Sequence, residues 1–349
     1  MTNSTEEFAG RVVTDMAAVM SGVMTNIGHK LGLYRAMAGQ GSVTSDSVAR
    51  STGTDERYVR EWLNNQVAGG YVVYETESGT YELPAHHEPV LVDEDSPVFL
   101  VPALEVAASL WLDEQKLLDV FRSGQGISWG EHHHRLFCGS ESLFRPGYKS
   151  FLATEWLDNL QGVRQKLESG AKVADIGCGH GASTITLARA FPDSEFFGYD
   201  LHAESIAVAR QRARDEPGEQ RISFTQCDAN SVPQLGFDLI CFMDCLHDMG
   251  DPVGAARRAR EAMNEDGTLL LVEPLARDCV SDNINPVSRL YYAASTAVCT
   301  PCSRSQDVGL ALGAQAGPQR LTEILNEAGF TRVRVATSTG FNLVMEAKI

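Results

Sequence analysis

The stretch Lys172–Pro192, KVADIGCGHGASTITLARAFP, places a strand, a glycine turn and a helix in direct succession. Val173–Ile176 form a short β-prone run, and Ala182–Ala190 show helical periodicity until Pro192 ends the helix. Three glycines between them allow backbone angles and close approaches that a Cβ would forbid: Gly177, Gly179 and Gly181. This order predicts the first strand-turn-helix unit of a doubly wound sheet, with a loop for a nucleotide-type cofactor.

An acid, Asp175, stands just before this turn, whose glycine spacing is GxGxG. A dinucleotide-binding turn has the spacing GxGxxG and no acid at that place, because its ligand there is an anionic pyrophosphate at a helix N-terminus. The acid therefore favours a cationic ligand.

The run DxGxGxG, from Asp175 to Gly181, resembles motif I of the class I S-adenosylmethionine-dependent methyltransferases. In that family the glycines admit the cofactor and the acid helps to bind its methionine end. The resemblance implies S-adenosyl-L-methionine as cofactor and a seven-stranded, Rossmann-like α/β sheet with a reversed terminal strand.

The next strands end in acids that fit the same family. The strand over 195–199 is followed by Asp200, which can accept hydrogen bonds from both ribose hydroxyls; a capping or salt-bridging acid is the alternative. After the strand over 221–226, the resemblance assigns Asp228 to the adenine amino group and the amide of Ala229 to the ring. It also implies cofactor contacts by Leu201, Met243 and Asp244.

His247 follows the fourth strand, the almost wholly apolar run over 237–243. An imidazole titrates near neutrality, so it can take a proton from a hydroxyl at the carboxyl edge of the sheet. The segment CLHDMGDP resembles the HDW-containing segment of plant and bacterial O-methyltransferases, whose histidine is the catalytic base, although Met249 replaces the aromatic residue. Capping of the following helix is the alternative. Glu273 matches an acid that orients this histidine, and it could equally bind substrate.

The N-terminal third predicts a mainly helical domain. Apolar residues recur at three- and four-residue steps from Phe8 to Met37, which indicates amphipathic helices that form a core or a dimer interface. Helices capped by Thr44 or Ser45 and by Thr54 or Asp55 then precede a hairpin around Glu77–Gly79. This order resembles a winged helix-turn-helix, the dimerisation domain of small-molecule O-methyltransferases, and it implies a homodimer.

Charge disfavours nucleic acid as a partner of this domain. The formal net charge is −17, and the expected recognition helix balances its arginines with acids, namely Asp55, Glu56 and Glu61. We therefore expect no binding of nucleic acid.

The expected organisation is a winged-helix domain over 1–98, a helical connector over 99–169 and a methyltransferase domain over 170–349. Helical patterns are expected over 99–121 and 143–167, separated by the glycine- and histidine-rich segment 124–139. The irregular segment Pro274–Gly317 is expected to form a substrate lid.

Composition places the chain among soluble globular proteins, with 349 residues of which 43% are hydrophobic. We expect a cytoplasmic location and no membrane contact, because no signal peptide or apolar span is visible. The eight cysteines lack a disulfide framework. Cys299 and Cys302 form a CxxC without a second such pair, so no metal is expected, and His132–His134 are expected to be solvated.

The sequence thus predicts methyl transfer to a small-molecule acceptor, at oxygen before nitrogen or sulfur, with His247 as base. Two other functions are considered. One is a transcriptional regulator that senses the cofactor; the other is a nicotinamide-dependent oxidoreductase, which Asp175 and the glycine spacing disfavour. The acceptor is not specified by the sequence.

Overall fold

A computed structural model describes residues 4–349, which form two compact units. One unit comprises the chain up to Ser109 together with Arg135–Gly147, and the other comprises Leu110–His134 and Tyr148–Ile349. The predicted connector over 99–169 is therefore divided between them. Within residues 4–349, none of the helices has the length and apolar character needed to cross a bilayer.

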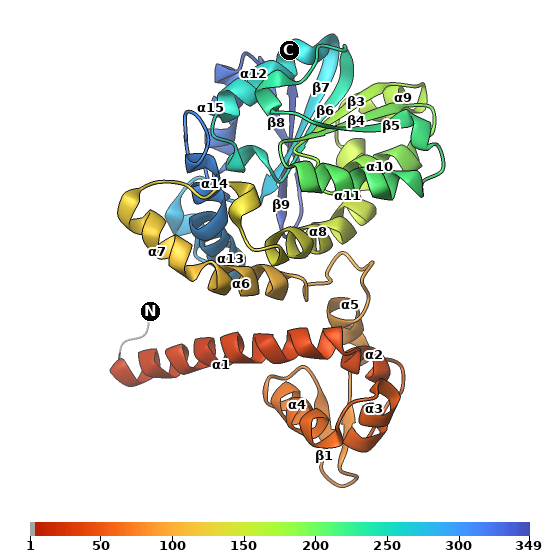
Figure 1. Cartoon of the computed structure of the whole chain (residues 1–349), viewed down its shortest axis with the longest axis vertical. Helices are drawn as coiled ribbons and strands as arrows, with labels where there is room; N and C mark the ends of the chain where they lie inside the picture. Colours follow the sequence, from red (N-terminus) through yellow and green to blue (C-terminus); the bar gives the residue numbers. More distant parts are fainter. Residues whose placement is uncertain (1–3) are drawn as a thin grey trace. The chain divides into compact units, whose positions relative to one another are not determined.

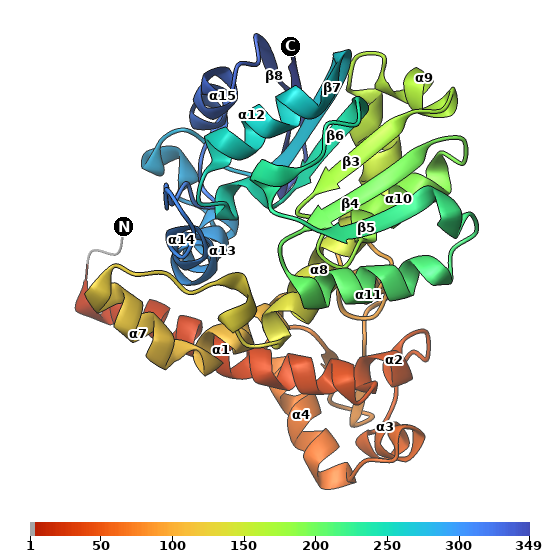
Figure 2. The ribbon, with the colours of Figure 1, turned by 45° about the horizontal axis from the view of Figure 1, so that its top comes forward.

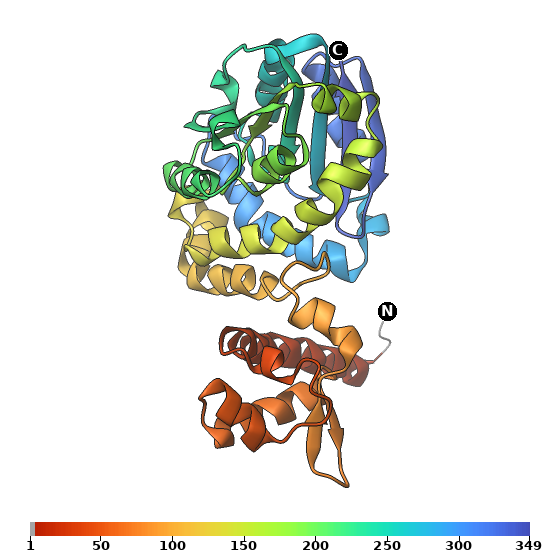
Figure 3. The same cartoon turned by 90° about the vertical axis from the view of Figure 1, so that its right-hand side faces the viewer.

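The N-terminal unit is mainly helical and carries one small hairpin (Figures 1 and 3). Asp55 caps α4 through its carboxylate, and Thr44 caps α3 in a capping box with Ser47, so one of each pair of predicted caps is confirmed. Its elements are α1 (Thr5–Lys30), α2 (Leu33–Met37), α3 (Ser45–Thr52), α4 (Glu56–Ala68), β1 (Val73–Glu75), β2 (Thr80–Glu82), η1 (Ala85–His87), α5 (Glu88–Leu91), most of α6 (Ala103–Leu112) and α8 (Arg135–Gly147).

Only part of the apolar stripe of this unit enters its core. Leu33, Tyr34 and Met37 of α2 are buried with Trp62 and Leu63 of α4. The apolar face of α1 instead remains exposed, through Phe8, Val12, Val13, Met16, Val19, Met20, Val23 and Ile27. Methionines 16 and 20 are 59% and 72% exposed, so no segment within residues 4–349 covers this face.

The second unit is built on a seven-stranded sheet (Figure 2). The strands are β3 (Lys172–Ile176), β4 (Glu195–Asp200), β5 (Ile222–Gln226), β6 (Phe237–Met243), β7 (Met263–Pro274), β8 (Arg332–Ser338) and β9 (Asn342–Lys348). Their order is β5-β4-β3-β6-β7-β9-β8, and β9 is antiparallel to both of its neighbours. This confirms the predicted Rossmann-like sheet with one reversed strand.

Helices cover both faces of the sheet, which is why its central strands are apolar on both sides. Alternate residues of β3, β6 and β7 pack with α12 (Pro252–Ala262) and α15 (Pro318–Glu327). On the other face, α10 (Ala182–Ala190) and α11 (Ala203–Arg214) share a smaller core with Phe224 of β5.

The remaining elements of this unit are short helices between the sheet strands and helices before β3 or between β7 and β8. Between the sheet strands lie η4 (Glu219–Arg221), η5 (Ala229–Ser231) and η6 (Leu246–Asp248). The others are α7 (Glu114–Ser123), η2 (Trp129–Glu131), η3 (Tyr148–Trp156), α9 (Val163–Glu168), η7 (Val280–Asn283), α13 (Pro286–Ala294), η8 (Ser295–Cys299) and α14 (Thr300–Arg304).

The helical patterns before the sheet were only partly predicted correctly. The helix expected over 99–121 is instead two helices that are interrupted at Asp113. The Asp113 carboxylate accepts hydrogen bonds from the backbone N–H of His133 and from the Lys116 side chain. His132 is buried and its Nδ1 lies 3.2 Å from Asp113, so its expected solvation is wrong. Helix α8 also begins inside the segment expected to separate two helices.

Candidate functional site

The candidate site lies at the carboxyl ends of the parallel strands. There the glycine turn follows β3, Asp200 ends β4, Asp228 follows β5, Asp244 follows β6 and Glu273 lies near the end of β7. Ligands of open α/β sheets bind at this edge. The order of the strands therefore brings five segments that are far apart in sequence to one place.

The glycine turn needs glycine for two different reasons. Gly177 and Gly181 have φ angles of 75° and 78°, and a Cβ on either would lie 2.6 Å from the Cys245 sulfur or the Phe224 ring, respectively. Gly179 has a φ of 51°, but no described atom lies within 4 Å of the place its Cβ would take. The turn is therefore packed on two sides and open at its middle glycine.

Asp175 lies beneath this turn and is 1% exposed. Its Oδ2 accepts hydrogen bonds of 2.6 Å from the hydroxyls of Ser183 and Thr184, which ties the strand to the start of α10. Its Oδ1 has no hydrogen-bond partner among the described residues. Burial raises the pKa of this carboxyl. A direct contact between Asp175 and a ligand stays a prediction.

Asp200 faces the same turn from the end of β4. Its carboxylate accepts 2.8 Å hydrogen bonds from the backbone N–H groups of Gly179 and His202. Burial raises the pKa of Asp200 as well. The adjacent Leu201 side chain is 56% exposed.

The next acid, Asp228, is exposed, and its Oδ1 accepts a 2.7 Å hydrogen bond from the backbone N–H of Asn230. Asp228 thereby caps the short helix η5, which begins at Ala229. One of its carboxylate oxygens makes no such bond within the described chain. Its role toward adenine stays a prediction.

Asp244 is held in a strained backbone conformation, with a φ of +50°. The Tyr148 hydroxyl donates a 2.9 Å hydrogen bond to its Oδ2, and the Asn342 amide donates one of 2.9 Å to its Oδ1. Burial, followed by the nearby Glu273 carboxylate, raises the pKa of Asp244 to about 7. Met243 before it is buried in the sheet.

His247 and Glu273 form a buried pair, with 4% and 2% of their surfaces exposed. The imidazole Nδ1 contacts Glu273 Oε2, and the other carboxylate oxygen accepts a 3.1 Å hydrogen bond from the backbone N–H of Leu246. Glu273 therefore fixes both the ring and the backbone of the short helix η6. The alternative in which His247 caps the following helix does not apply, because the Asp251 side chain caps α12.

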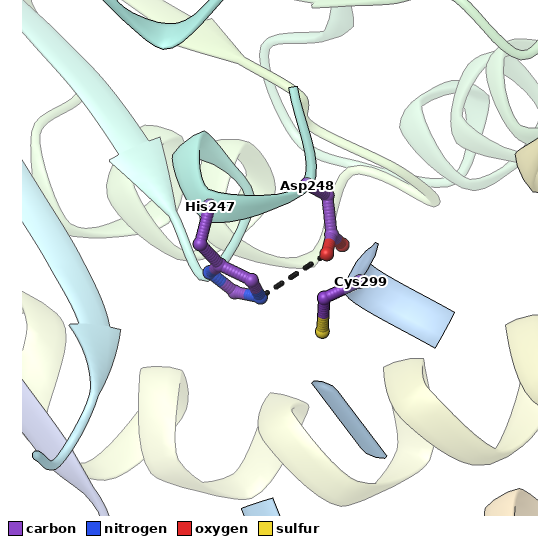
Figure 4. A group of neighbouring side chains, drawn as sticks. All are labelled: His247, Asp248 and Cys299. Atoms are coloured by element: carbon purple, nitrogen blue, oxygen red, sulfur yellow. Dashed lines mark ion pairs between the residues drawn. The ribbon is translucent and has the colours of Figure 1, made fainter. Parts of the chain in front are cut away.

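The second ring nitrogen of His247 points to Asp248 and Cys299 (Figure 4). Its Nε2 lies 3.3 Å from Asp248 Oδ1. Burial alone would lower the pKa of His247, but the Glu273 and Asp248 carboxylates raise it well above its usual value. The two carboxylates thus increase the proton affinity of the imidazole.

Sequence reasoning missed the contacts that several residues make in this site. Tyr148 and Asn342 reach Asp244 from 96 and 98 positions away, and Cys299 reaches His247 from the segment expected to be a lid. The only signals were the aromatic character of the helix before β3 and the CxxC at Cys299. Neither indicates a partner.

Two family descriptions match the chain. Residues 18–92 match the Rv2258c-like winged HTH domain, and residues 167–329 match the methyltransferase domain. These ranges fall on the helix and hairpin elements of the first unit and on the sheet of the second.

Curated relatives match part of the chain. The chain is 29% identical over 145 residues to the 27-O-demethylrifamycin SV methyltransferase of Amycolatopsis mediterranei, covering 41% of this chain and 51% of that protein. It is 30% identical over 149 residues to the mitochondrial ubiquinone biosynthesis O-methyltransferase of Saccharomyces cerevisiae, covering 40% and 47%. The chain thus matches about half the length of these relatives.

Solved structures share the fold over the whole chain. Human N-acetylserotonin methyltransferase, in complex with S-adenosylmethionine, superposes with a TM-score of 0.71 at 18% identity and 99% coverage of both chains. The mitomycin 7-O-methyltransferase MmcR gives 0.67 at 17% identity and covers 100% of both. The glycine turn, the reversed strand and both domain matches agree, and the chain belongs to the class I S-adenosylmethionine-dependent methyltransferases that carry an N-terminal winged-helix domain.

Proposed function

We propose that this protein transfers the methyl group of S-adenosylmethionine to an oxygen of a small-molecule acceptor, with His247 as general base. The observation that carries the proposal is the buried His247–Glu273 pair, which lies at the same sheet edge as the glycine turn. A histidine with one nitrogen fixed by a carboxylate is suited to accept a proton at the other.

The residues at the sheet edge fit a cationic cofactor. Asp175 is buried and Asp200 and Asp244 are half-buried, and burial raises the pKa of all three. The hydrogen bonds described above come to them from hydroxyl, amide and backbone N–H groups, which stabilise a carboxylate without neutralising it. A cation bound here would relieve that burial cost, whereas an anionic pyrophosphate would add to it.

The glycine turn and its neighbours also offer room for the nucleoside part. The open side of Gly179 lets a ligand approach the backbone, and Asp200 keeps acceptor capacity for ribose hydroxyls beside its two backbone bonds. The exposed Leu201 supplies an apolar surface for the adenine ring, and Asp228 and Ala229 lie at the end of the neighbouring strand. We assign these residues to cofactor binding on that basis.

The cofactor supplies an electrophilic methyl group on its sulfonium. The protein must hold the acceptor hydroxyl in line with that methyl and remove its proton. His247 Nε2 is the atom we assign to the proton, because Nδ1 is engaged with Glu273. The negative charges of Glu273 and Asp248 stabilise the imidazolium that forms, which makes the neutral ring a stronger base.

We further propose that the protein acts as a homodimer through α1. Eight apolar side chains on this helix are exposed, and a second copy would remove them from water.

The recognition helix α4 carries the ion pairs Glu56–Arg60 and Arg57–Glu61, which leave little positive charge for DNA. A reducing, cytoplasmic location is supported by the eight free cysteines.

A methyl-transfer screen tests the proposed function. The protein is incubated with S-adenosylmethionine labelled in its methyl group and with sets of phenolic, carboxylic and amine acceptors. We expect label in hydroxyl-bearing products. Label confined to amine products, or a nicotinamide cofactor copurifying with the protein, would contradict the proposal.

A further inference from the structure

Three potential metal ligands, one of them the proposed base, lie close together. His247 and Asp248 come from η6 and Cys299 from the end of η8, and all three belong to the sheet-bearing unit. One ligand atom from each lies within 4.8 Å of the other two. Figure 4 shows the imidazole and the carboxylate facing each other, with the Cys299 side chain beside them.

The donor types suit zinc. Imidazole nitrogen, carboxylate oxygen and thiolate sulfur are its usual ligands, and harder ions such as Mg²⁺ prefer oxygen alone. A histidine that binds a metal normally donates its other ring N–H to a carboxylate, which fixes the tautomer and orients the ring. Glu273 makes that contact with His247 Nδ1 and leaves Nε2 toward Asp248 and Cys299.

One carboxylate oxygen in this group also lacks a hydrogen bond. Asp248 Oδ1 is buried and has no hydrogen-bond partner among residues 4–349, although it lies 3.3 Å from His247 Nε2. Buried polar atoms in native proteins are satisfied in the great majority of cases, and an unsatisfied one can mark the place of an ion.

We propose that His247, Asp248 and Cys299 form a zinc site with three protein ligands and an open fourth position. Zinc would take the Nε2 lone pair that the imidazole needs in order to accept a proton. The metal and the base role of His247 would therefore exclude each other. This consequence rests on the proposed function, whereas the metal site itself does not.

Binding must displace a proton from the thiol. Burial, followed by the Asp248 carboxylate, raises the pKa of Cys299 to about 12, so the side chain is a neutral thiol at neutral pH. Metal binding forms a bond from zinc to the Cys299 sulfur and releases the thiol proton to solvent.

Cobalt is the probe of choice, because Co²⁺ occupies zinc sites and a thiolate ligand gives it a charge-transfer absorption in the near ultraviolet. The full chain is treated with a chelator, dialysed and titrated with Co²⁺. We expect this band to saturate at one ion for each chain and to disappear when Zn²⁺ is added. No band with Co²⁺ in excess would overturn the proposal.

Matched variants show which thiol is involved. Cys299→Ser should abolish the band, and Cys279→Ser, at an exposed cysteine of the same unit, should leave it unchanged. Asp248→Asn should keep a weaker band and lower the Co²⁺ affinity at least tenfold. A band of full strength in Cys299→Ser would refute the assignment.

Binding of S-adenosylhomocysteine is measured on the same samples and serves as the check on folding. If a variant binds S-adenosylhomocysteine like the wild type, it is folded, and loss of the band then shows that the replaced residue binds the metal. If the wild type shows the band but transfers no methyl group after zinc is removed, the proposed function fails while the metal site stands.

Discussion

Replacing Asp244 by Asn tests the electrostatics of the sheet edge. The side chain is half-buried, and burial raises its pKa from 3.8 to about 7. Asn has nearly the same shape and tolerates the positive φ of +50° at this position. The Tyr148 hydroxyl can turn and accept a hydrogen bond from the new amide, so the packing should survive.

The sign of the pH dependence follows from the raised pKa. Below pH 3.8 Asp244 is protonated in both the folded and the unfolded protein, so it adds no pH dependence. Between pH 3.8 and about 7 the folded protein keeps a proton that the unfolded chain has lost, and its stability falls as the pH rises. Above about pH 7 both states are ionised and the full cost of the buried charge is present.

The magnitude follows from the same two values. At about 1.4 kcal/mol for each tenfold step in proton affinity, the gap from 3.8 to about 7 corresponds to about 4 kcal/mol. Asn cannot ionise, so Asp244→Asn should gain stability relative to the wild type as the pH rises. We expect a gain of roughly 2–4 kcal/mol between pH 5 and pH 8.5, on top of a constant loss of about 1 kcal/mol from the altered hydrogen bonds.

Urea unfolding of the ligand-free protein at several pH values measures this difference. Asp193→Asn, at an exposed acid before β4, is the control and should track the wild type at every pH. A stability difference between Asp244→Asn and the wild type that stays constant from pH 5 to 8.5 would refute the reasoning.

Three other predictions concern the cofactor and the assembly. S-adenosylhomocysteine should raise the Tm of the wild type, and Asp200→Ala should largely lose this shift in a thermal melt; an equal shift in both proteins would remove the ribose assignment. Gly177→Ala should lower the free energy of unfolding in urea by about 1–3 kcal/mol, because the φ of this residue is 75° and the new Cβ would lie 2.6 Å from a sulfur atom. The same variant should bind S-adenosylhomocysteine more weakly in calorimetry, and unchanged binding would contradict a rigid turn. In light scattering, the wild type should have the mass of a dimer and Met16→Glu with Met20→Glu that of a monomer, whereas Thr14→Glu on the same helix should remain dimeric; a monomeric wild type at micromolar concentration would contradict the interface.

Much of the sheet could be predicted because its signals are local. The glycine spacing after β3, the apolar β6 and the acids that follow successive strands are each read from a few neighbouring residues. The seven strands and the reversed β9 then followed from the family that motif I resembles, and the structure has both. The caps of α3 and α4 are local in the same way.

The parts that could not be predicted depend on contacts between distant segments. Tyr148 reaches Asp244 only because η3 packs beside the sheet, and Cys299 reaches His247 only because the segment after β7 folds back. The burial of His132 depends in the same way on Asp113, 19 residues earlier. Composition and periodicity do not encode such pairings, and a histidine-rich loop looks solvated until its partner is known.

The central claim is that His247 removes the proton of a hydroxyl acceptor. The direct measurement is methyl transfer by His247→Ala and by the wild type from pH 6 to 10, on one hydroxyl acceptor and in the presence of a chelator. The variant should bind S-adenosylhomocysteine like the wild type and lose about 10²–10⁴-fold in kcat at neutral pH. Part of that loss should return at high pH, where the acceptor ionises without help. Turnover close to the wild type at neutral pH, with the same hydroxyl acceptor, would contradict the claim.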